Sequence, residues 1–212
     1  TDLWDFNSEN PKVPSEQEIK AAVATVDYQQ IKIEGNTVSL SLDGARLDVG
    51  GLAKGYIADR IVDHLVDNEV TQGIVNLGGN VGTIGEKEDG TPWRIGINRP
   101  YSDGSEVIGT VPASDNCVIT SGIYERFFVV DGVQYHHIID PTTGYPVKND
   151  LESVTIVGAG GTSMECDAYS TICLLLGTEE SLVILKQLPD IEALFLDSND
   201  YVTMTEGLQF EE

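Results

Sequence analysis

Residues 47–66 read LDVGGLAKGYIADRIVDHLV, and the hydrophobic spacing changes within this stretch. Its first residues close a predicted strand, ARLDV, whereas Ile57, Ile61 and Leu65 recur every four residues, the spacing of one helix face. The glycine pair Gly50-Gly51 separates the two patterns. A strand, two glycines and a helix in direct succession predict a fold with both element types, in which the unpaired N–H groups of a helix start lie beside an open backbone.

Short strands make up most of the remaining chain, with a few helices between them and no internal repeat. Ser15 followed by Glu18 predicts a capping box for a first helix. The turns Gly35-Asn36 and Asp43-Gly44 predict an antiparallel meander of IKIE, TVSLSL and ARLDV. This order predicts one α+β domain over residues 1–212, with a mixed or antiparallel sheet flanked by helices. Further strands are predicted at GIVNLGGNVGTIG, WRIGINRP, 107–111, 117–121, RFFVV, VQYHHII, SVTIVG, EALFLD and YVTMT, and further helices at MECDAYSTICLLLG and between Thr178 and Pro189.

The composition indicates a folded, strongly acidic protein. Of its 212 residues, 41% are hydrophobic, and 12 basic residues stand against 35 acidic ones, which gives a formal charge of -23. This charge disfavours binding to nucleic acid or to anionic lipid, because like charges repel. A phosphorylated ligand would have to be bound by backbone N–H groups, a few basic side chains or a divalent cation held by carboxylates.

The cysteines and the hydrophobic runs argue against several other classes of protein. Cys117, Cys166 and Cys173 show no CxxC or CxxH spacing, so we expect buried free thiols rather than a disulfide framework or a zinc ribbon. No apolar run approaches the ~18 residues that a membrane span requires, so no transmembrane segment is predicted in this chain.

The segment LDVGGLAKGY, residues 47–56, is the first candidate site. The positive end of a helix, together with glycines that permit close approach, favours an anionic ligand. The spacing matches neither the Walker pattern GxxxxGK[ST] nor GxGxxG. A tight turn whose glycines only supply unusual dihedral angles is an equal alternative.

The segment ECDAYSTI is the second candidate site. Asp167, Ser170 and Thr171 stand at i, i+3 and i+4, so their oxygens share one helical face, an arrangement that suits Mg²⁺ or Ca²⁺. By itself this pattern more often reflects helix capping than metal coordination.

The segment YHHIIDPTTGYPV, residues 135–147, is the third candidate site. In a strand, His136 and His137 point to opposite faces, so the pair is not a chelating unit. A single histidine near Asp140 is commonly a structural group, and DPTTGYP is favourable turn chemistry in its own right. Each of the three segments alone leaves the function open.

Taken together and in this order, LDVGGLAKGY, NLGGN, SGIYERFF, YHHIIDPTTGYPV and DAYST resemble the ApbE-like family, the FAD:protein FMN transferases. The resemblance implies a T-fold-like α+β domain that binds FAD in a cleft and Mg²⁺ at the diphosphate. It implies transfer of FMN from FAD to a threonine or serine hydroxyl of a target flavoprotein, with release of AMP. Some relatives instead act as a pyrophosphatase that splits FAD into FMN and AMP, and a non-catalytic module for FAD binding or partner docking is a further alternative.

The resemblance also assigns residues to the FAD site. Asp48 and Lys54 correspond to contacts with the flavin nucleotide, and Ile139 corresponds to a wall of the site. The acceptor hydroxyl needs a base, and His137 is the first candidate because a neutral imidazole is matched to near-neutral pH. Asp48 is the second candidate for this catalytic role.

For the metal, the resemblance implies three ligands: the main-chain carbonyl of Gly51 and the side chains of Asp167 and Thr171. Ser170 stands where some relatives carry a carboxylate, so we expect it to reach the ion weakly or through water. A hard cation at these oxygens would neutralise charge on the diphosphate during its cleavage.

Members of the family usually carry a further N-terminal portion, with an export signal and often a lipid-anchored cysteine. We therefore expect this chain to be N-terminally incomplete. The resemblance implies that the parent is an exported lipoprotein, associated with the membrane at its periplasmic or extracellular face, although the chain itself shows no signal segment.

Overall fold

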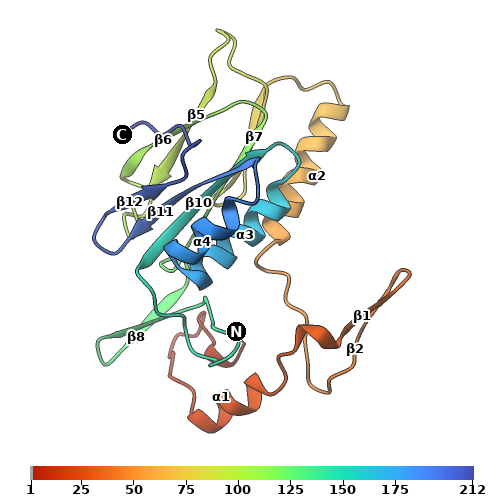
Figure 1. The fold of residues 1–212 in the computed structure, drawn as a ribbon, viewed down its shortest axis with the longest axis vertical. Helices are drawn as coiled ribbons and strands as arrows, with labels where there is room; N and C mark the ends of the chain where they lie inside the picture. Colours follow the sequence, from red (N-terminus) through yellow and green to blue (C-terminus); the bar gives the residue numbers. More distant parts are fainter. Residues whose placement is uncertain (1) are drawn as a thin grey trace. The chain divides into compact units, whose positions relative to one another are not determined.

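The structure is a computed structural model that describes residues 2–212, and it contains two units (Figure 1). The N-terminal unit consists of residues 2–48 and Arg126–Lys148, and the sheet unit consists of Val49–Glu125 and Asn149–Glu212. Every strand pair among the described residues is antiparallel. The predicted α+β class is therefore confirmed, with an antiparallel rather than a mixed sheet.

An aromatic core holds the N-terminal unit together. Trp4, Ile19 and Phe128 are almost fully buried, and the Trp4 indole N–H donates to the Gly144 carbonyl at 3.0 Å. This bond ties the start of the chain to the DPTTG turn. The elements of the unit are η1 (Asp2–Trp4), α1 (Glu16–Val23), η2 (Tyr28–Gln30), β1 (Ile31–Glu34), β2 (Thr37–Leu40), β8 (Phe127–Val130) and β9 (Val133–His136).

The local predictions for the N-terminal unit have different outcomes. Ser15 and Glu18 form the predicted capping box at α1, and β1 pairs with β2 across the predicted turn at 35–36. The predicted third strand of the meander, ARLDV at 45–49, is wrong, because these residues lie outside every described strand. Leu47 is 57% exposed, so neither a strand partner nor burial of alternate side chains stabilises a strand there.

The sheet unit combines short strands with three helices. Its strands are β3 (Gly73–Asn76), β4 (Asn80–Ile84), β5 (Trp93–Asn98), β6 (Val107–Ala113), β7 (Asn116–Gly122), β10 (Leu151–Ala159), β11 (Ile191–Asp197) and β12 (Val202–Met204). Its helices are α2 (Ala53–Asp67), α3 (Ser163–Leu176) and α4 (Thr178–Leu185). Among residues 2–212, no helix is long and apolar enough to cross a membrane.

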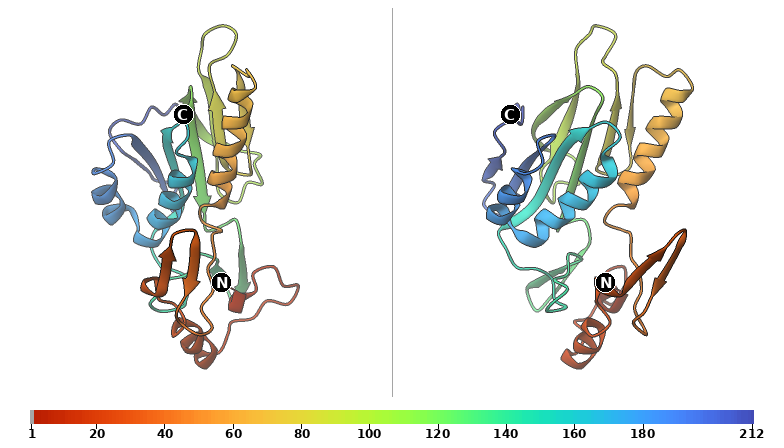
Figure 2. Two further views of the ribbon diagram at one scale, coloured as in Figure 1. Left: turned by 90° about the vertical axis from the view of Figure 1, so that its right-hand side faces the viewer. Right: turned by 45° about the vertical axis from the view of Figure 1, so that its right-hand side comes forward.

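The two faces of the central sheet carry different elements. Six strands form this sheet in the order β12-β11-β10-β7-β4-β3, and α2, α3 and α4 pack on one face (Figures 1 and 2). The β5–β6 hairpin packs on the other face, where Val81 and Val118, partners in the strand register, lie in its buried cluster. Alternation along β4 and β7 then turns the adjacent residues, among them Asn80 and Cys117, towards the helices.

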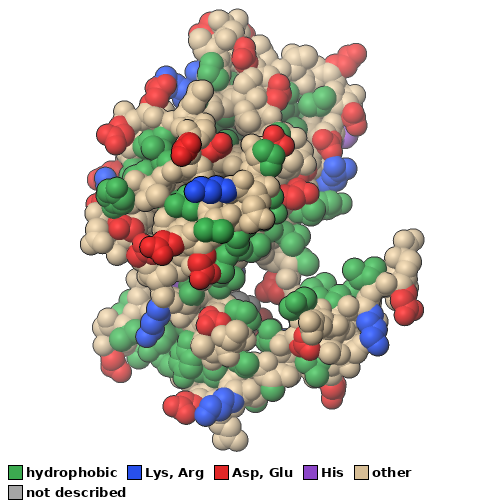
Figure 3. Space-filling model, in the orientation of Figure 1, with side chains coloured by type: hydrophobic (Ala, Val, Ile, Leu, Met, Phe, Trp, Pro, Cys, Tyr) green, Lys and Arg blue, Asp and Glu red, His purple; other side chains and the backbone are tan. Residues whose placement is uncertain are grey.

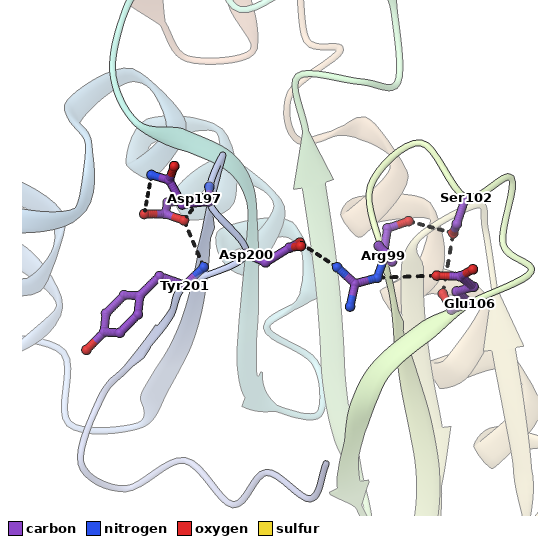
Figure 4. Close-up of polar contacts among 7 residues, drawn as sticks. Arg99, Ser102, Glu106, Asp197, Asp200 and Tyr201 are labelled. Carbon is purple, nitrogen blue, oxygen red and sulfur yellow. Dashed lines mark hydrogen bonds and ion pairs between the residues drawn. The ribbon is translucent and has the colours of Figure 1, made fainter.

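A polar cluster connects the end of β5 to the β11–β12 turn (Figure 4). The Arg99 guanidinium contacts the carboxylates of Asp200 and Glu106, and the Ser102 hydroxyl donates to the Arg99 carbonyl at 2.6 Å. Because the charged side chains are well exposed, these ion pairs order the loops and contribute little to stability.

Helices α2 and α3 cap each other's amino-terminal ends. Neither helix has a side-chain cap from its own N-cap residue. The Asp59 carboxylate of α2 accepts hydrogen bonds from the Ser163 and Met164 amides, both at 3.0 Å, in the first turn of α3. The Asp167 carboxylate of α3 accepts from the Gly55 amide, at 2.9 Å, in the first turn of α2. In these reciprocal caps, each carboxylate lies at the positive end of the other helix, where negative charge is stabilised.

Gly55 lets the two helices approach closely enough for the reciprocal caps. A Cβ at this position would lie 2.1 Å from the Ser163 carbonyl oxygen, which is far too close for any side chain. The buried residues of α2 are Gly55, Ala58 and Asp59, whereas Ile57 of the predicted apolar stripe is 48% exposed. The helix forms as predicted. Its fully buried residues are small or polar, whereas Ile61 and Leu65 of the predicted stripe are half-buried.

His136 is the buried member of the histidine pair, with 7% of its surface exposed. Its Nε2 atom lies 3.1 Å from the Val147 carbonyl oxygen and therefore carries the proton, and Nδ1 has no hydrogen-bond partner among the described residues. Burial lowers the pKa of His136 below its ordinary value of 6.5, because the charged ring would lose its hydration. His136 is a structural group, the alternative that the sequence pattern favoured.

Removing the Asp59 cap should destabilise the protein. We expect Asp59→Ala to lower the free energy of unfolding by about 1–2 kcal/mol, because the buried amide of Ser163 and the partly buried amide of Met164 lose their acceptor. The measurement is urea unfolding followed by circular dichroism. Asp63→Ala is the matched control, since Asp63 lies one turn further along α2 and pairs with Arg60 at the surface. Equal losses in the two variants would contradict the role assigned to Asp59.

The buried His136 should make stability depend on pH. Below pH 6.5 the unfolded chain binds a proton that the folded ring resists, so the urea midpoint should fall as the pH decreases through this value. His136→Gln keeps an N–H donor and removes the titration, so it should weaken this dependence. The exposed His64 provides the control His64→Gln, which should behave like the unsubstituted chain. The same pH slope in all three proteins would show that His136 is not responsible.

Candidate functional site

The sheet unit brings four of the predicted site residues to the meeting point of α2 and α3. Gly51 and Lys54 lie at the start of α2, and Asp167 and Thr171 lie one turn apart on α3. A Cβ on Gly51 would be 3.4 Å from the Thr171 Oγ1 atom, so the glycine backbone adjoins this hydroxyl. We call Gly51, Asp167, Thr171 and the neighbouring Asn80 the α2–α3 cluster.

Asp167 is the charged member of the α2–α3 cluster, and only 2% of it is exposed. Besides the Gly55 amide, it accepts a hydrogen bond from Asn80 Nδ2 at 3.4 Å. The capping alternative that the sequence pattern left open is therefore realised, although the capped amide belongs to a different helix. A carboxylate has more acceptor positions than these two bonds use, so capping and metal coordination are compatible.

Asn80 is a member of the cluster that the sequence analysis quoted within NLGGN but did not single out. It is fully buried, and its Oδ1 atom has no hydrogen-bond partner among the described residues. An unpartnered oxygen in the interior costs free energy unless a ligand or water satisfies it. The sequence feature that could have pointed to Asn80 is its position, as a polar residue directly after two glycines and at the start of an apolar strand.

The donor set of the cluster fits a hard divalent cation such as Mg²⁺. It offers the Asp167 carboxylate, the Thr171 hydroxyl and the backbone at Gly51, with the unpartnered oxygen of Asn80 nearby, and oxygen donors are those that Mg²⁺ prefers. Among residues 2–212, no group of three His, Cys, Asp or Glu side chains could hold a metal. With one carboxylate, the cluster suits an ion that takes further ligands from substrate phosphates.

Ser170 makes hydrogen bonds within the protein. Its hydroxyl donates to the Asp167 carbonyl at 2.8 Å and shares a hydrogen bond of 2.7 Å with the hydroxyl of Ser121 on β7. The bond with Ser121 holds α3 against the sheet. Thr171 also donates to the Asp167 carbonyl, at 3.3 Å. The weak or water-mediated contact of Ser170 with an ion stays a prediction.

Lys54 reaches from α2 to the β3–β4 turn, where its Nζ atom donates to the Gly78 carbonyl at 3.3 Å. The Asn76 side chain accepts from the amides of Gly78 and Gly79, at 3.1 and 3.4 Å. Both glycines have positive φ, 65° and 93°, a conformation that other residues rarely adopt. The ammonium group and the start of α2 supply positive charge near this turn, which favours an anionic ligand.

A cavity of about 610 Å³ adjoins the same glycine turn. Its wall includes Gly78, Thr120, Arg94 and Tyr124, together with apolar residues of the sheet and of β5. Burial, with a smaller effect of the Glu125 charge, raises the pKa of Tyr124 to about 12, so its phenol stays neutral at physiological pH. The wall also carries the polar side chains of Asn76, Asn98 and Glu125, so it offers both apolar and polar contacts to a small organic molecule.

Asp48, His137 and Ile139 belong to the N-terminal unit. His137 Nδ1 lies 3.2 Å from the Arg126 carbonyl oxygen and therefore carries the proton, which makes Nε2 the basic nitrogen of the neutral ring. Ile139 packs against the aromatic core around Trp4, and Asp48 is exposed. The roles predicted for these three residues at the flavin nucleotide stay predictions.

The chain is similar to several known proteins along most of its length. The profile of the ApbE family matches residues 1–195. A FAD:protein FMN transferase of Klebsiella pneumoniae is 39% identical over 199 residues, which cover 93% of this chain and 60% of that protein. A FAD:protein FMN transferase of Treponema pallidum is 36% identical over 221 residues, covering 97% and 60%. The chain thus spans about 60% of the length of these relatives.

Solved structures agree with this relationship. The crystal structure of the ApbE protein of Thermotoga maritima matches with a TM-score of 0.86 at 35% identity, covering 97% of this chain and 67% of that one. The flavin transferase ApbE of Vibrio cholerae matches with a TM-score of 0.80 at 32% identity, covering 96% and 64%. Profile, sequence and fold therefore coincide, and the chain belongs to the ApbE family.

Proposed function

We propose that this chain is the catalytic part of a Mg²⁺-dependent FAD:protein FMN transferase. It would move FMN from FAD onto a threonine or serine hydroxyl of a target flavoprotein and release AMP. The observation that carries the proposal is the α2–α3 cluster, in which a buried carboxylate and neutral oxygens lie at a helix amino terminus. Similar proteins named for this activity support it.

The overall charge of the chain makes local positive charge necessary for a diphosphate substrate. The formal charge is -23, and Figure 3 shows acidic side chains spread over the viewed face with few basic ones between them. Lys54 and the N–H groups at the start of α2 supply positive charge near the cluster. A divalent cation adds more, which accounts for an acidic protein that acts on an anionic nucleotide.

We assign Asp167, Thr171 and the Gly51 carbonyl as the ligands of Mg²⁺. The Asn80 amide donates to Asp167 and so orients its carboxylate. When bound, the ion would act as a Lewis acid that neutralises charge on the diphosphate oxygens. The cavity beside Tyr124 is large enough for an organic ring system, and we assign it to part of FAD.

The transfer is an in-line displacement at the phosphorus of the FMN half. The acceptor oxygen forms the new P–O bond, the bond between the FMN phosphorus and the bridging oxygen breaks, and AMP leaves with its electron pair. On the family resemblance, we propose that His137 is the base that takes up the proton of the acceptor hydroxyl. Asp48 is the alternative base.

From the family resemblance alone, we also propose that the parent protein is exported and lipid-anchored.

Incubation of the chain with FAD, Mg²⁺ and an acceptor flavoprotein domain tests this function. The acceptor should gain covalent, fluorescent flavin on a denaturing gel, and AMP should appear in equal amount. Chelation of Mg²⁺, or replacement of the acceptor threonine by valine, should abolish both signals. Free FMN and AMP without an acceptor would indicate the pyrophosphatase instead, and FAD binding without AMP would indicate a binding or docking module.

Removing the charge of Asp167 should abolish the response to Mg²⁺. We expect Asp167→Asn to lower the transfer rate by about 100-fold or more, because the cluster loses its charged ligand. The fold should persist, since the asparagine oxygen can still accept from the Gly55 amide. The measurements are the rate at increasing Mg²⁺ and calorimetric FAD binding with and without the ion. Asp63→Asn, a charge change at the surface of α2, is the control. An unchanged Mg²⁺ response in Asp167→Asn would refute the metal assignment.

Replacing the proposed base should slow the chemistry and leave binding intact. We expect His137→Gln to lower the transfer rate by about 10²–10⁴-fold with unchanged affinity for FAD, because the acceptor hydroxyl loses its proton acceptor. Single-turnover rates and calorimetry separate the two effects, and His64→Gln is the control for histidine removal. If His137→Gln were fully active and Asp48→Asn were slow, Asp48 rather than His137 would be the base.

A further inference from the structure

Two of the three cysteines meet in the interior of the sheet unit. Cys117 on β7 and Cys166 on α3 are 49 positions apart in the sequence, and their Sγ atoms lie 3.4 Å apart. They are 1% and 0% exposed. The third cysteine, Cys173, is also buried, but among residues 2–212 its sulfur has no such sulfur partner. The expectation of buried free thiols is confirmed, but two of them form a pair.

The space around the two sulfur atoms is shaped by a glycine. Gly158 on β10 lies opposite Cys117 in the strand register, and a Cβ there would be 2.5 Å from Cys166 Sγ and 3.4 Å from Cys117 Sγ. The hydroxyl of Thr162 lies 3.7 and 3.6 Å from the sulfurs of Cys117 and Cys166. The missing side chain therefore makes room for both sulfurs, and close packing holds them in contact.

We propose that Cys117 and Cys166 are a peroxide-sensitive thiol pair that closes to a reversible disulfide. Nothing in the proposed transfer reaction uses either sulfur. The proposed oxidant is a small peroxide, because the bulky disulfides that carry out thiol exchange cannot reach sulfur atoms that are 1% and 0% exposed. To form the bond, the Sγ atoms need to approach from 3.4 Å to about 2.0 Å. A small shift of the turn of α3 that carries Cys166 towards the sheet would close this distance.

The oxidation proceeds in two displacements. Cys117, as its thiolate, attacks a peroxide oxygen, so that an S–O bond forms, the O–O bond breaks and hydroxide leaves, taking up a proton to become water. The second sulfur then attacks the sulfenic acid, the S–S bond forms, the S–O bond breaks and a second water leaves. The two sulfurs together lose two electrons, which the peroxide accepts.

The crosslink would join the first half of α3 covalently to the central sheet. It closes a loop between two distant positions and therefore stabilises the folded state relative to the unfolded chain. Cys166 directly precedes Asp167, so the bond also restrains the turn of α3 that carries this carboxylate.

The test is treatment of the full chain with hydrogen peroxide, followed by alkylation under denaturing conditions and peptide mapping by mass spectrometry. We expect a Cys117–Cys166 crosslinked peptide, an alkylated Cys173 and recovery of all three thiols with dithiothreitol. The oxidised chain should also unfold at a higher urea concentration than the reduced chain. Three alkylated thiols, after exposure that fully oxidises glutathione in the same tube, would overturn the proposal, as would stable sulfinic acids or crosslinks to Cys173.

Cysteine variants give an independent readout. Cys173→Ser should retain both the crosslinked peptide and the shift in urea midpoint, whereas Cys117→Ser and Cys166→Ser should lose both. If the latter two variants fail to fold, the peptide map of the unsubstituted chain and of Cys173→Ser decides the question. A peroxide-induced shift that persists in a folded Cys117→Ser variant would contradict the assignment.

Discussion

The reciprocal caps between α2 and α3 are the constraint on which the helical face of the sheet unit depends. A buried helix start needs acceptors for its N–H groups, and neither helix obtains one from its own N-cap side chain. Each acceptor therefore comes from the other helix, through Asp59 and Asp167. Because both contacts must form at once, they set the separation and the rotation of the two helices, and Gly55 supplies the room.

The proposed chemistry follows from this structural requirement. A carboxylate that is 2% exposed needs compensation, and the Gly55 amide at the positive end of α2 supplies it. The same carboxylate retains acceptor positions for a cation, and the unpartnered oxygen of Asn80 lies in the same interior region. One residue thus satisfies a helix terminus and offers a hard ligand, which places the candidate metal site where the two helices are held most firmly.

Helix α3 supports two separate contacts through neighbouring residues. Successive side chains on a helix point about 100° apart, so Cys166 faces the sheet and Asp167 faces α2. Glycine has the same physical role on both sides: Gly158 makes room for the sulfur pair, and Gly55 makes room for the helix crossing. A larger side chain at either glycine would therefore displace α3, from α2 in one case and from the sheet in the other.

The sequence by itself determined the short-range features, since capping boxes, glycine turns and helical periodicity depend on residues only a few positions apart. The Ser15 capping box and α2 formed as predicted, and five ordered motifs identified the family. The prediction of a strand at ARLDV was wrong, because a strand also needs a pairing partner and burial of alternate side chains. Only the tertiary structure decided that Asp59 caps α3, that Asp167 meets Gly55 and that two cysteines touch. These contacts join residues 104, 112 and 49 positions apart, and no local pattern along a chain specifies which distant side chains meet in space.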